Sequence, residues 1–225
     1  MGKLILRTII IFLTISLVLV AVLFVLAGTL SYWQAWVFVV VFAVCTNVIG
    51  IYLSLKDPAL LERRLKVGPA AEQSSAQRII SAASLMVFLA MFLICALSRR
   101  FGWSSVPAMV SLSGDVLVAL GMYIWLLTFR ENTYGASTVK TFEGQKVIST
   151  GPYAIVRHPM YVALMITMVG IPFALDAWLG LVVFVLGVPI LIWRILDEER
   201  FLRTELSGYM EYARRVHWRL LPGVW

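Results

Sequence analysis

Residues 4–28 read LILRTIIIFLTISLVLVAVLFVLAG, and Arg7 is the only charged residue among them. A helix needs about 20 consecutive apolar residues to cross the hydrocarbon core of a bilayer, so this stretch predicts a membrane-spanning helix. Three more runs of this kind lie near residues 33–55, 79–97 and 106–129. The sequence therefore predicts an all-α integral membrane protein that begins with four transmembrane helices.

A last apolar block covers residues 160–196 and contains residues that interrupt helices. These are Gly170, Pro172, Asp176 and Gly180. We expect two short helices in a hairpin, which gives six transmembrane helices, or five if the hairpin does not cross the bilayer fully. Residues 195–216 mix charged and apolar positions with an approximately helical period, which predicts an amphipathic helix on the cytoplasmic surface.

The composition supports the membrane class. Hydrophobic residues make up 61% of the chain and charged residues 14%, whereas soluble domains have about 45–50% and about 25%. The two cysteines, Cys45 and Cys95, lie inside apolar runs and predict packed thiols. Only two histidines are present, so we expect no metal site.

The positive charges are distributed unevenly along the chain. All but two of the 19 Lys and Arg residues lie in segments expected on one side of the bundle, and the exceptions are Arg99 and Arg100. The positive-inside rule then places both termini in the cytoplasm. We expect the protein to lie in a bacterial or archaeal cell membrane. The net charge of +7 suits loops beside anionic lipid, so we expect no nucleic-acid partner.

Residues 151–161 read GPYAIVRHPMY and stand where the last apolar block begins. Polar side chains at a membrane boundary cost free energy unless they face a cavity or a partner. Pro159 disfavours the helical conformation at His158, so a helix should start there. At the far end of the hairpin lies a second polar cluster, Arg194, Glu198 and Glu199. We expect the two clusters to close onto one pocket.

The motifs in this region, taken together, resemble a known family. They are Gly151-Pro152-Tyr153, Arg157-His158-Pro159-x-Tyr161, Arg194-x-x-x-Glu198-Glu199-x-x-Leu202 and Tyr209-x-x-Tyr212. The sequence resembles the isoprenylcysteine carboxyl methyltransferases and their prokaryotic relatives, a group that includes phospholipid N-methyltransferases. The resemblance covers roughly residues 132–222. It implies a membrane enzyme that uses S-adenosyl-L-methionine to methylate a lipophilic acceptor among the membrane lipids.

The resemblance also implies roles for particular residues. It divides the chain into residues 1–130, four N-terminal helices, and residues 131–225, the catalytic region. The implied cofactor-binding residues are Gln145, Lys146, Val147, Ile148, Tyr153, His158, Pro159, Met160, Tyr161 and Glu198. Gln145 stands where the eukaryotic enzymes carry His. Arg194 is implicated in holding a substrate carboxylate, and Glu199 is the alternative to Glu198 as cofactor ligand.

The chemistry of methyl transfer fits these residue types. Transfer from a sulfonium needs in-line approach in a desolvated pocket more than it needs a general base. Tyr153 and Tyr161 offer aromatic faces that attract a cation. Arg194 can grip a carboxylate with two hydrogen bonds, as an acceptor such as isoprenylated cysteine requires. If the acceptor is instead a phospholipid amine, a proton acceptor such as Glu199 is needed.

Other functions are compatible with the same residues. A membrane reductase using NADPH has a similar hairpin layout, but it needs several basic groups for the cofactor phosphates. A non-enzymatic membrane chaperone or a transporter subunit predicts no cofactor affinity at all. Transport is disfavoured because no pair of broken helices recurs in two repeats.

The single residues also have simpler interpretations. Arg194 and Glu198 are four apart and predict an exposed helix ion pair when taken alone. His158 alone predicts a helix cap. Tyr209 and Tyr212 predict interfacial anchors. Asp115 lies in the middle of an apolar run beside small residues, which predicts a hydrogen-bonded helix contact rather than a catalytic group.

Overall fold

The computed structural model describes residues 2–65, 67–72, 74–135, 137–139, 141–142 and 144–225. Within these residues the chain forms eight α-helices and two short 3-10 helices, and no strand. The elements are α1 (Gly2–Ala27), α2 (Trp33–Lys56), α3 (Pro58–Leu65), η1 (Pro69–Ala71), α4 (Ser75–Phe101), α5 (Ala108–Glu131), η2 (Gly151–Ala154), α6 (Pro159–Ala174), α7 (Gly180–Glu205) and α8 (Tyr209–Arg215). The predicted all-α class is confirmed.

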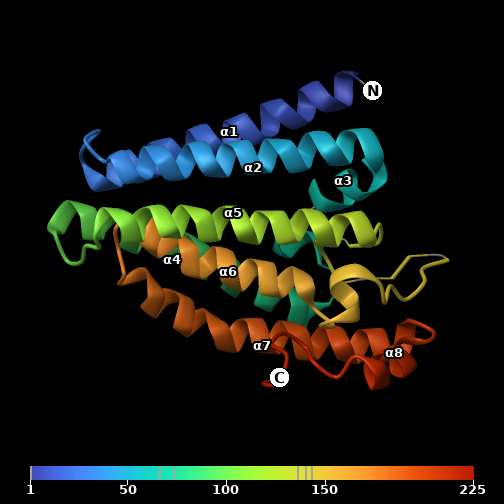
Figure 1. Ribbon diagram of the computed structural model, residues 1–225. Helices are drawn as coiled ribbons and strands as arrows, with labels where there is room; N and C mark the ends of the chain where they lie inside the picture. Colours follow the sequence, from blue (N-terminus) through green and yellow to red (C-terminus); the bar gives the residue numbers. More distant parts are fainter. Residues whose placement is uncertain (1, 66, 73, 136, 140, 143) are drawn as a thin grey trace.

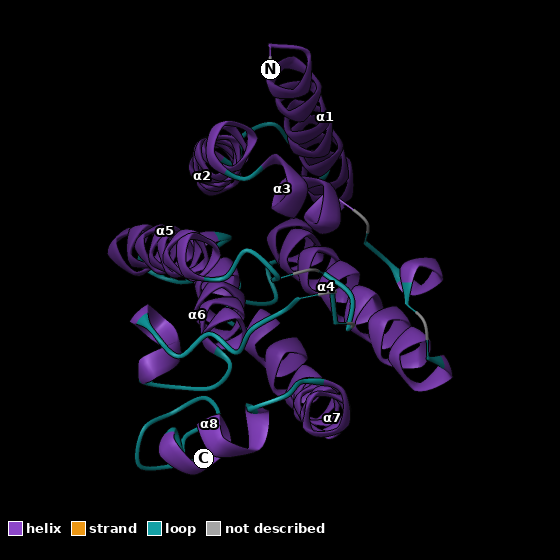
Figure 2. Cartoon of the chain, turned by 90° about the vertical axis from the view of Figure 1, so that its right-hand side faces the viewer, coloured by secondary structure: helices purple, strands orange, loops and turns teal. Residues whose placement is uncertain are grey.

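The long helices lie roughly side by side (Figure 1). Seen end-on, α1 and α2 form one side of the molecule, α4 to α7 form the remainder, and α8 lies beside the end of α7 (Figure 2). Five helices are long and apolar enough to cross a membrane: α1, α2, α4, α5 and α7. The protein is therefore a multi-pass membrane protein.

The last hairpin differs from the expected pair of short helices. Helix α6 is short, with 16 residues, but α7 has 26 and is among the five long spans. Pro189 lies inside α7 without ending it. Residues 197–205, which follow the apolar part of α7, are mostly Glu, Arg and Leu, and these favour helix, so the helix continues through them.

The expected amphipathic helix at residues 195–216 is also corrected. Its first half is the end of α7, and only Tyr209–Arg215 forms a separate helix, α8. The break falls at Gly208, which has a φ of 83°. That conformation suits glycine and cannot continue a right-handed helix.

Helices α5 and α6 pack closely because glycines line their contact. A Cβ atom added at Gly114 would lie 2.8 Å from the carbonyl oxygen of Gly170, and one added at Gly121 would lie 2.7 Å from that of Ala163. Ser111 in α5 also donates a hydrogen bond of 2.9 Å to the carbonyl of Ala174. Small residues of this kind let helix backbones approach in a membrane, and the contact fixes α6 against α5.

Asp115 lies beside this contact and is buried. Neither of its carboxylate oxygens has a hydrogen-bond partner within the described part of the chain. The predicted helix contact is therefore made by its neighbours Ser111 and Gly114, and Asp115 itself does not take part in it by hydrogen bonding.

Two groups of polar side chains lie at opposite ends of the helices. We call the end that carries α3, the start of α6 and α8 the polar end (Figure 1). The other end, called the clasp end, is organised around Asp176, a buried residue with a φ of 56°. Its carboxylate accepts hydrogen bonds from the Gln34 side chain at 3.1 Å and the Val106 amide at 2.6 Å. Arg99 lies 3.8 Å from the same carboxylate.

Candidate functional site

The stretch at residues 151–161 forms η2 and then enters α6. Helix α6 begins at Pro159, which confirms the predicted start, and His158 precedes it in a non-helical conformation with φ −124° and ψ 62°. The His158 side chain does not cap the helix. Its Nε2 lies 3.2 Å from Oε1 of Glu199 in α7 instead. The cap interpretation of His158 is therefore wrong.

Tyr161, Glu198 and Arg194 join α6 to α7 by hydrogen bonds. The Tyr161 hydroxyl donates to Oε2 of Glu198 at 2.5 Å and accepts from Nε of Arg194 at 3.1 Å. The structure thus brings together the two polar clusters that the sequence suggested would meet. One of their links is the tyrosine hydroxyl, which joins a carboxylate to a guanidinium.

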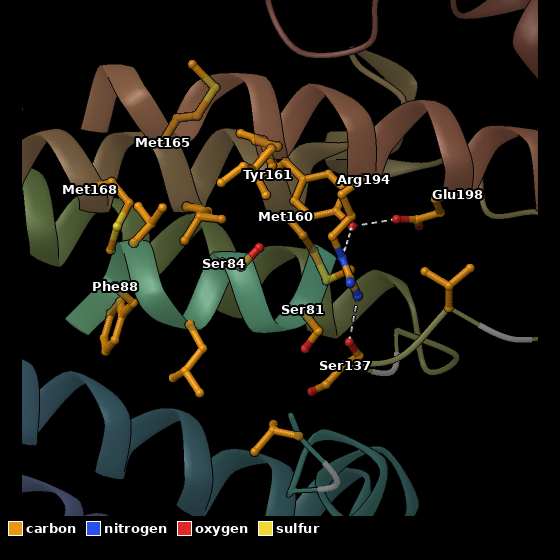
Figure 3. A pocket seen from close by; sticks show the side chains of 18 of the residues that line it. Ser81, Ser84, Phe88, Ser137, Met160, Tyr161, Met165, Met168, Arg194 and Glu198 are labelled. Atoms are coloured by element: carbon orange, nitrogen blue, oxygen red, sulfur yellow. Dashed lines mark hydrogen bonds between the residues drawn. The ribbon is translucent and has the colours of Figure 1, made fainter. Parts of the chain in front are cut away.

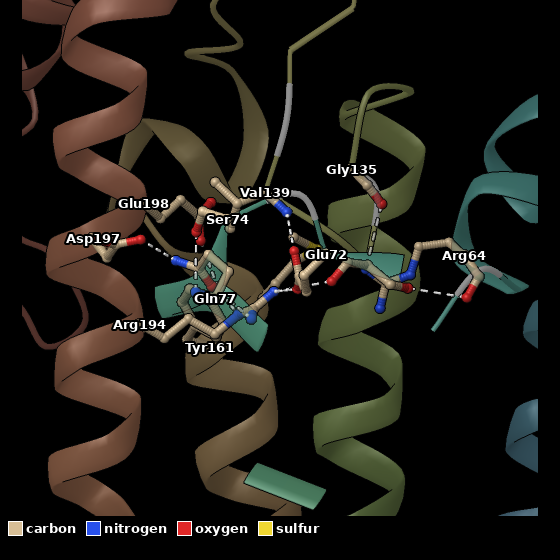
Figure 4. A network of polar contacts seen from close by, with 12 residues as sticks. Arg64, Glu72, Ser74, Gln77, Gly135, Val139, Tyr161, Arg194, Asp197 and Glu198 are labelled. Atoms are coloured by element: carbon tan, nitrogen blue, oxygen red, sulfur yellow. Dashed lines mark hydrogen bonds and ion pairs between the residues drawn. The ribbon is translucent and has the colours of Figure 1, made fainter. Parts of the chain in front are cut away.

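Arg194 makes further contacts with segments that the motif did not include. Its guanidinium donates to Gln77 at 2.9 Å, to Glu72 at 3.0 Å and to the carbonyl of Ser137 at 3.0 Å. Figure 4 shows this network. The side chains of Arg194 and Glu72 are only 14% and 2% exposed. The interpretation of Arg194 as half of an exposed pair with Glu198 is therefore wrong.

Sequence reasoning missed Glu72 and Gln77. Glu72 lies just before α4 and Gln77 lies in its first turn. The sequence shows this segment only as a polar linker. No periodicity or motif connects this linker with α7. The sequence shows only that a polar segment next to a membrane helix needs polar partners or water for its side chains. That requirement does not identify the partner.

Glu199 lies at the centre of a separate ion-pair cluster. Its carboxylate lies 3.1 Å from Arg157, 3.2 Å from His158 and 3.1 Å from Arg219. The tail that carries Arg219 also pairs with the motif, because the amide of His158 donates to the carbonyl of Arg219 at 3.0 Å. Glu199 is 2% exposed and is held by cations, so it fastens the tail and α7 to the entrance of α6.

A large cavity of about 430 Å³ lies between α4, α6 and α7 near this network (Figure 3). Its walls are mainly apolar, and Phe88, Met165 and Met168 are among the side chains that line it. Arg64, Arg194 and Glu198 line its polar end. The lining residues Leu85 and Phe88 are 47% and 37% exposed, so the cavity opens on the side of the bundle.

A smaller cavity of about 100 Å³ lies next to it. All the residues expected to bind the cofactor line this cavity: Gln145, Lys146, Val147, Ile148, Tyr153, His158, Pro159, Met160, Tyr161 and Glu198. Arg194 lines only the large cavity, and Glu199 lines neither. The two cavities share lining residues, namely Thr138, Val139, Met160, Tyr161 and Glu198. The Tyr161–Glu198 pair therefore stands where the two cavities adjoin.

Tyrosines make up much of the small cavity. Tyr153 accepts a hydrogen bond of 2.9 Å from Asn132, and burial raises the pKa of its hydroxyl to about 12. Tyr212 donates to the carbonyl of Tyr153 at 2.8 Å, and burial raises the pKa of both Tyr209 and Tyr212. Tyr209 and Tyr212 are 4% and 2% exposed, so the interfacial-anchor interpretation is wrong for both. All three phenols are neutral at physiological pH.

Gln145 contributes to the small cavity in a different way from the other residues. Its side-chain oxygen accepts a hydrogen bond of 3.0 Å from the amide of Phe142, so part of its capacity is used inside its own loop. A histidine cannot offer an amide oxygen to that group. The glutamine thus organises the loop as well as lining the cavity.

Comparison with known families adds to this geometry. Residues 109–207 match the family model described as phospholipid methyltransferase. This part of the chain is similar to that family. The group includes isoprenylcysteine carboxyl methyltransferase and related phospholipid methyltransferases. A search of curated proteins found no match.

The matched region contains α6, α7 and all of α5 except its first residue, and with them Tyr153, Tyr161, Arg194 and Glu198. The match supports a membrane methyltransferase that acts on lipid-type substrates. The α3–α4 linker with Glu72 and the tail with Arg219 lie outside the match. Among the described residues, no group of three or more His, Cys, Asp and Glu side chains is arranged to hold a metal ion.

Proposed function

We propose that the protein transfers a methyl group from S-adenosyl-L-methionine to a lipid-linked or amphiphilic acceptor. The cofactor binds in the small cavity, and the apolar tail of the acceptor lies in the large one. One observation carries the proposal: the residues that the family resemblance assigns to the cofactor all line one cavity, which adjoins an apolar cavity at Tyr161 and Glu198.

The side chains of the small cavity suit this cofactor. The buried Tyr209 hydroxyl lines this cavity and has no hydrogen-bond partner among the described residues. It can therefore donate a hydrogen bond to a bound ligand. Tyr153, Tyr161 and Tyr212 place aromatic rings around a space that a sulfonium cation would favour. Glu198 supplies a carboxylate for cofactor hydroxyl or amino groups. When bound, S-adenosyl-L-methionine supplies a methyl group activated by the positive sulfur.

The size of the small cavity adds one requirement. Its volume of about 100 Å³ is below the roughly 300–1,000 Å³ of most small-molecule sites. A whole cofactor therefore needs the wall shared with the large cavity to open. We expect Tyr161 and Met160, which belong to that wall, to change their contacts when the cofactor enters.

The large cavity suits a hydrocarbon chain. Its volume of about 430 Å³ lies within the usual range for ligands, and its walls are mainly apolar. The exposed side chains of Leu85 and Phe88 mark an opening toward the space that lipid occupies. An acceptor can enter sideways from the bilayer and bring its polar head to Tyr161, Arg194 and Glu198.

Tyr161, Arg194 and Glu198 keep the reacting groups oriented and exclude water from them. The Tyr161 ring is fixed from two sides by Arg194 and Glu198, so its hydroxyl cannot rotate freely. A fixed hydrogen-bond donor and a fixed carboxylate beside the reacting groups lower the entropic cost of orienting the reactants. If the acceptor is an amine, Glu198 is the carboxylate that lines the cavity and can receive its proton, whereas Glu199 is engaged by Arg157, His158 and Arg219.

The proposed catalytic region extends beyond residues 131–225. That segment contains the cofactor residues, but Glu72, Gln77 and the α4 side of the large cavity come from the first 130 residues. We propose that the polar end faces the cytoplasm, because it carries most Lys and Arg residues. The match to a methyltransferase family favours this function over the NADPH-dependent reductase.

A transfer assay tests the proposal. Purified protein is incubated with methyl-labelled S-adenosyl-L-methionine and a total lipid extract, and label is counted in the organic phase. We expect label in lipid that falls by about 100-fold when Glu198→Gln replaces the wild type and persists with Glu211→Gln, an exposed glutamate of α8. The absence of labelled lipid with wild type, together with no cofactor binding by calorimetry, would contradict the proposal.

A further inference from the structure

Glu72 lies between η1 and α4 and is 3% exposed. One of its carboxylate oxygens accepts a hydrogen bond from Arg194 at 3.0 Å, and the other accepts one from the amide of Val139 at 3.2 Å. Its carbonyl accepts from Nε of Arg78 at 3.1 Å. The residue is thus fixed on three sides, and its side chain is directed at the guanidinium (Figure 4).

The hydrogen bonds of Arg194 leave little capacity for a substrate. A guanidinium has five N–H donors. Those of Arg194 are engaged by Tyr161, Gln77, Glu72 and the carbonyl of Ser137, which leaves one donor without a partner in the described part of the chain. A carboxylate gripped by two parallel hydrogen bonds therefore has to displace one of these partners.

Among the residues that the structure describes, the charges at the polar end of the large cavity balance. Arg64 and Arg194 are opposed by Glu72 and Glu198. Burial lowers the pKa of Arg64 to about 10, which leaves it protonated at neutral pH. Arg64, Arg194 and Glu198 line the cavity, whereas Glu72 lies outside the lining and contacts Arg194 from behind. In a low-dielectric site, an anion 3.0 Å from the guanidinium cancels much of its attraction for a second anion.

We propose that Glu72 determines the specificity of the acceptor site. It neutralises Arg194 and occupies its donors, so that the large cavity disfavours amphiphiles with a carboxylate head. Arg194 then acts as a positioning residue that holds Tyr161, rather than as the anchor of a substrate carboxylate. This inference rests on the proposed function, because it takes the large cavity as the acceptor site.

Binding of two matched probes tests the inference without the cofactor. Tritiated hexadecanoic acid and hexadecan-1-ol share one chain, and at alkaline pH only the acid is charged. Their dissociation constants are measured by equilibrium binding to detergent-purified wild type, Glu72→Gln and Glu62→Gln. Glu62 is an exposed glutamate of the neighbouring α3 and serves as the matched control.

We expect the wild type and Glu62→Gln to bind the acid no more tightly than the alcohol. Glu72→Gln should bind the acid about tenfold more tightly than the alcohol, since one partner of a close charge pair has been removed. A wild type that already prefers the acid about tenfold, or a Glu72→Gln ratio equal to that of the wild type, overturns the proposal.

A second pair of variants covers the case in which Glu72→Gln does not fold. Arg194→Gln leaves Glu72 without its counter-charge, so it should weaken binding of the acid relative to the alcohol. Adding Glu72→Gln to Arg194→Gln removes both charges and should restore equal binding. An Arg194→Gln ratio equal to that of the wild type, or a double variant that keeps the weakened ratio of Arg194→Gln, overturns the proposal. If neither probe binds to the wild type, the assignment of the large cavity as the acceptor site fails, and this inference fails with it.

Discussion

The two ends of the helices use similar side chains for different purposes. At the clasp end, Asp176 is held by Gln34, Arg99 and the amide of Val106, and these groups fasten one helix end to another. At the polar end, Tyr161, Arg194 and Glu198 are joined in the same manner, but they border two cavities. Under the proposed function, the adjoining space is what distinguishes the buried charges of the polar end from those of the clasp end.

The α5–α6 contact connects the two ends. Gly114 and Gly170 lie near the clasp end of this helix pair, and Gly121 lies nearer the polar end. The indole of Trp125 donates to the carbonyl of Met160 at 2.9 Å, which ties the start of α6 to α5. Because α6 carries Tyr161, a shift of α6 at the clasp end would be transmitted to both cavities. The following predictions separate the two ends.

The largest effect is expected from Glu198→Gln. The substitution removes the charge that faces both cavities and weakens the bond from Tyr161, a charge-assisted hydrogen bond. A loss of about 100-fold in kcat/KM is expected, in line with about 2–3 kcal/mol for such bonds. The measurement is label transfer to lipid, with circular dichroism as the check on folding. A rate within twofold of the wild type would show that the polar end is built like the clasp end, for structure alone.

Gly114→Val should damage the connection between the ends. The new side chain would meet the backbone of α6, so the helices must separate at a cost of about 1–3 kcal/mol. We expect a lower midpoint in thermal unfolding and a loss of transfer in the same variant. Val116→Leu, on an exposed position of the same helix, is the control and should leave both properties unchanged. An unfolding midpoint equal to the wild type would contradict the close α5–α6 packing.

Asp176→Asn should affect stability without affecting the site. It removes the charge next to Arg99 and weakens the bond from the Val106 amide, at about 1.5 kcal/mol. The unfolding midpoint should fall, while the affinity for S-adenosyl-L-methionine, measured by calorimetry, should equal that of the wild type. A matching loss of cofactor affinity would show that the clasp end belongs to the functional site.

The smallest effect is expected from Tyr212→Phe. The variant loses only the hydrogen bond to the Tyr153 carbonyl, a net contribution of about 0.5–1.5 kcal/mol. Cofactor affinity should fall by a few-fold, since the backbone of η2 is less well held. Tyr123→Phe, which alters an exposed tyrosine of α5 that lines neither cavity, should bind the cofactor like the wild type. Equal affinities for both variants would mean that α8 does not support the small cavity.

The sequence predicted those parts of the structure that depend on local pattern. Apolar length identified the first four spans, and the proline effect located the start of α6 at Pro159. The sequence did not predict that α7 would continue to Glu205. Polar residues after an apolar run are compatible either with a separate surface helix or with the end of the same helix. Position along the chain cannot distinguish the two; only packing can.

The candidate site was predicted unevenly for a similar reason. Residues close together in the motif, such as Tyr153 and Tyr161, do line one cavity. Glu72 and Arg219 reach the same region from distant segments, and their partners depend on how the helices are arranged. The different environments of Glu198 and Glu199 also arise from the helix rotation, which turns one toward the cavities and the other toward Arg157 and His158.

The most direct test of the two-cavity account is label transfer to lipid by Ser84→Trp at saturating S-adenosyl-L-methionine. Ser84 lines the large cavity from α4, away from the small one, so an indole there should fill the space for the acceptor tail. The account predicts that transfer falls to background while calorimetry shows wild-type affinity for the cofactor. Wild-type transfer by this variant would contradict it.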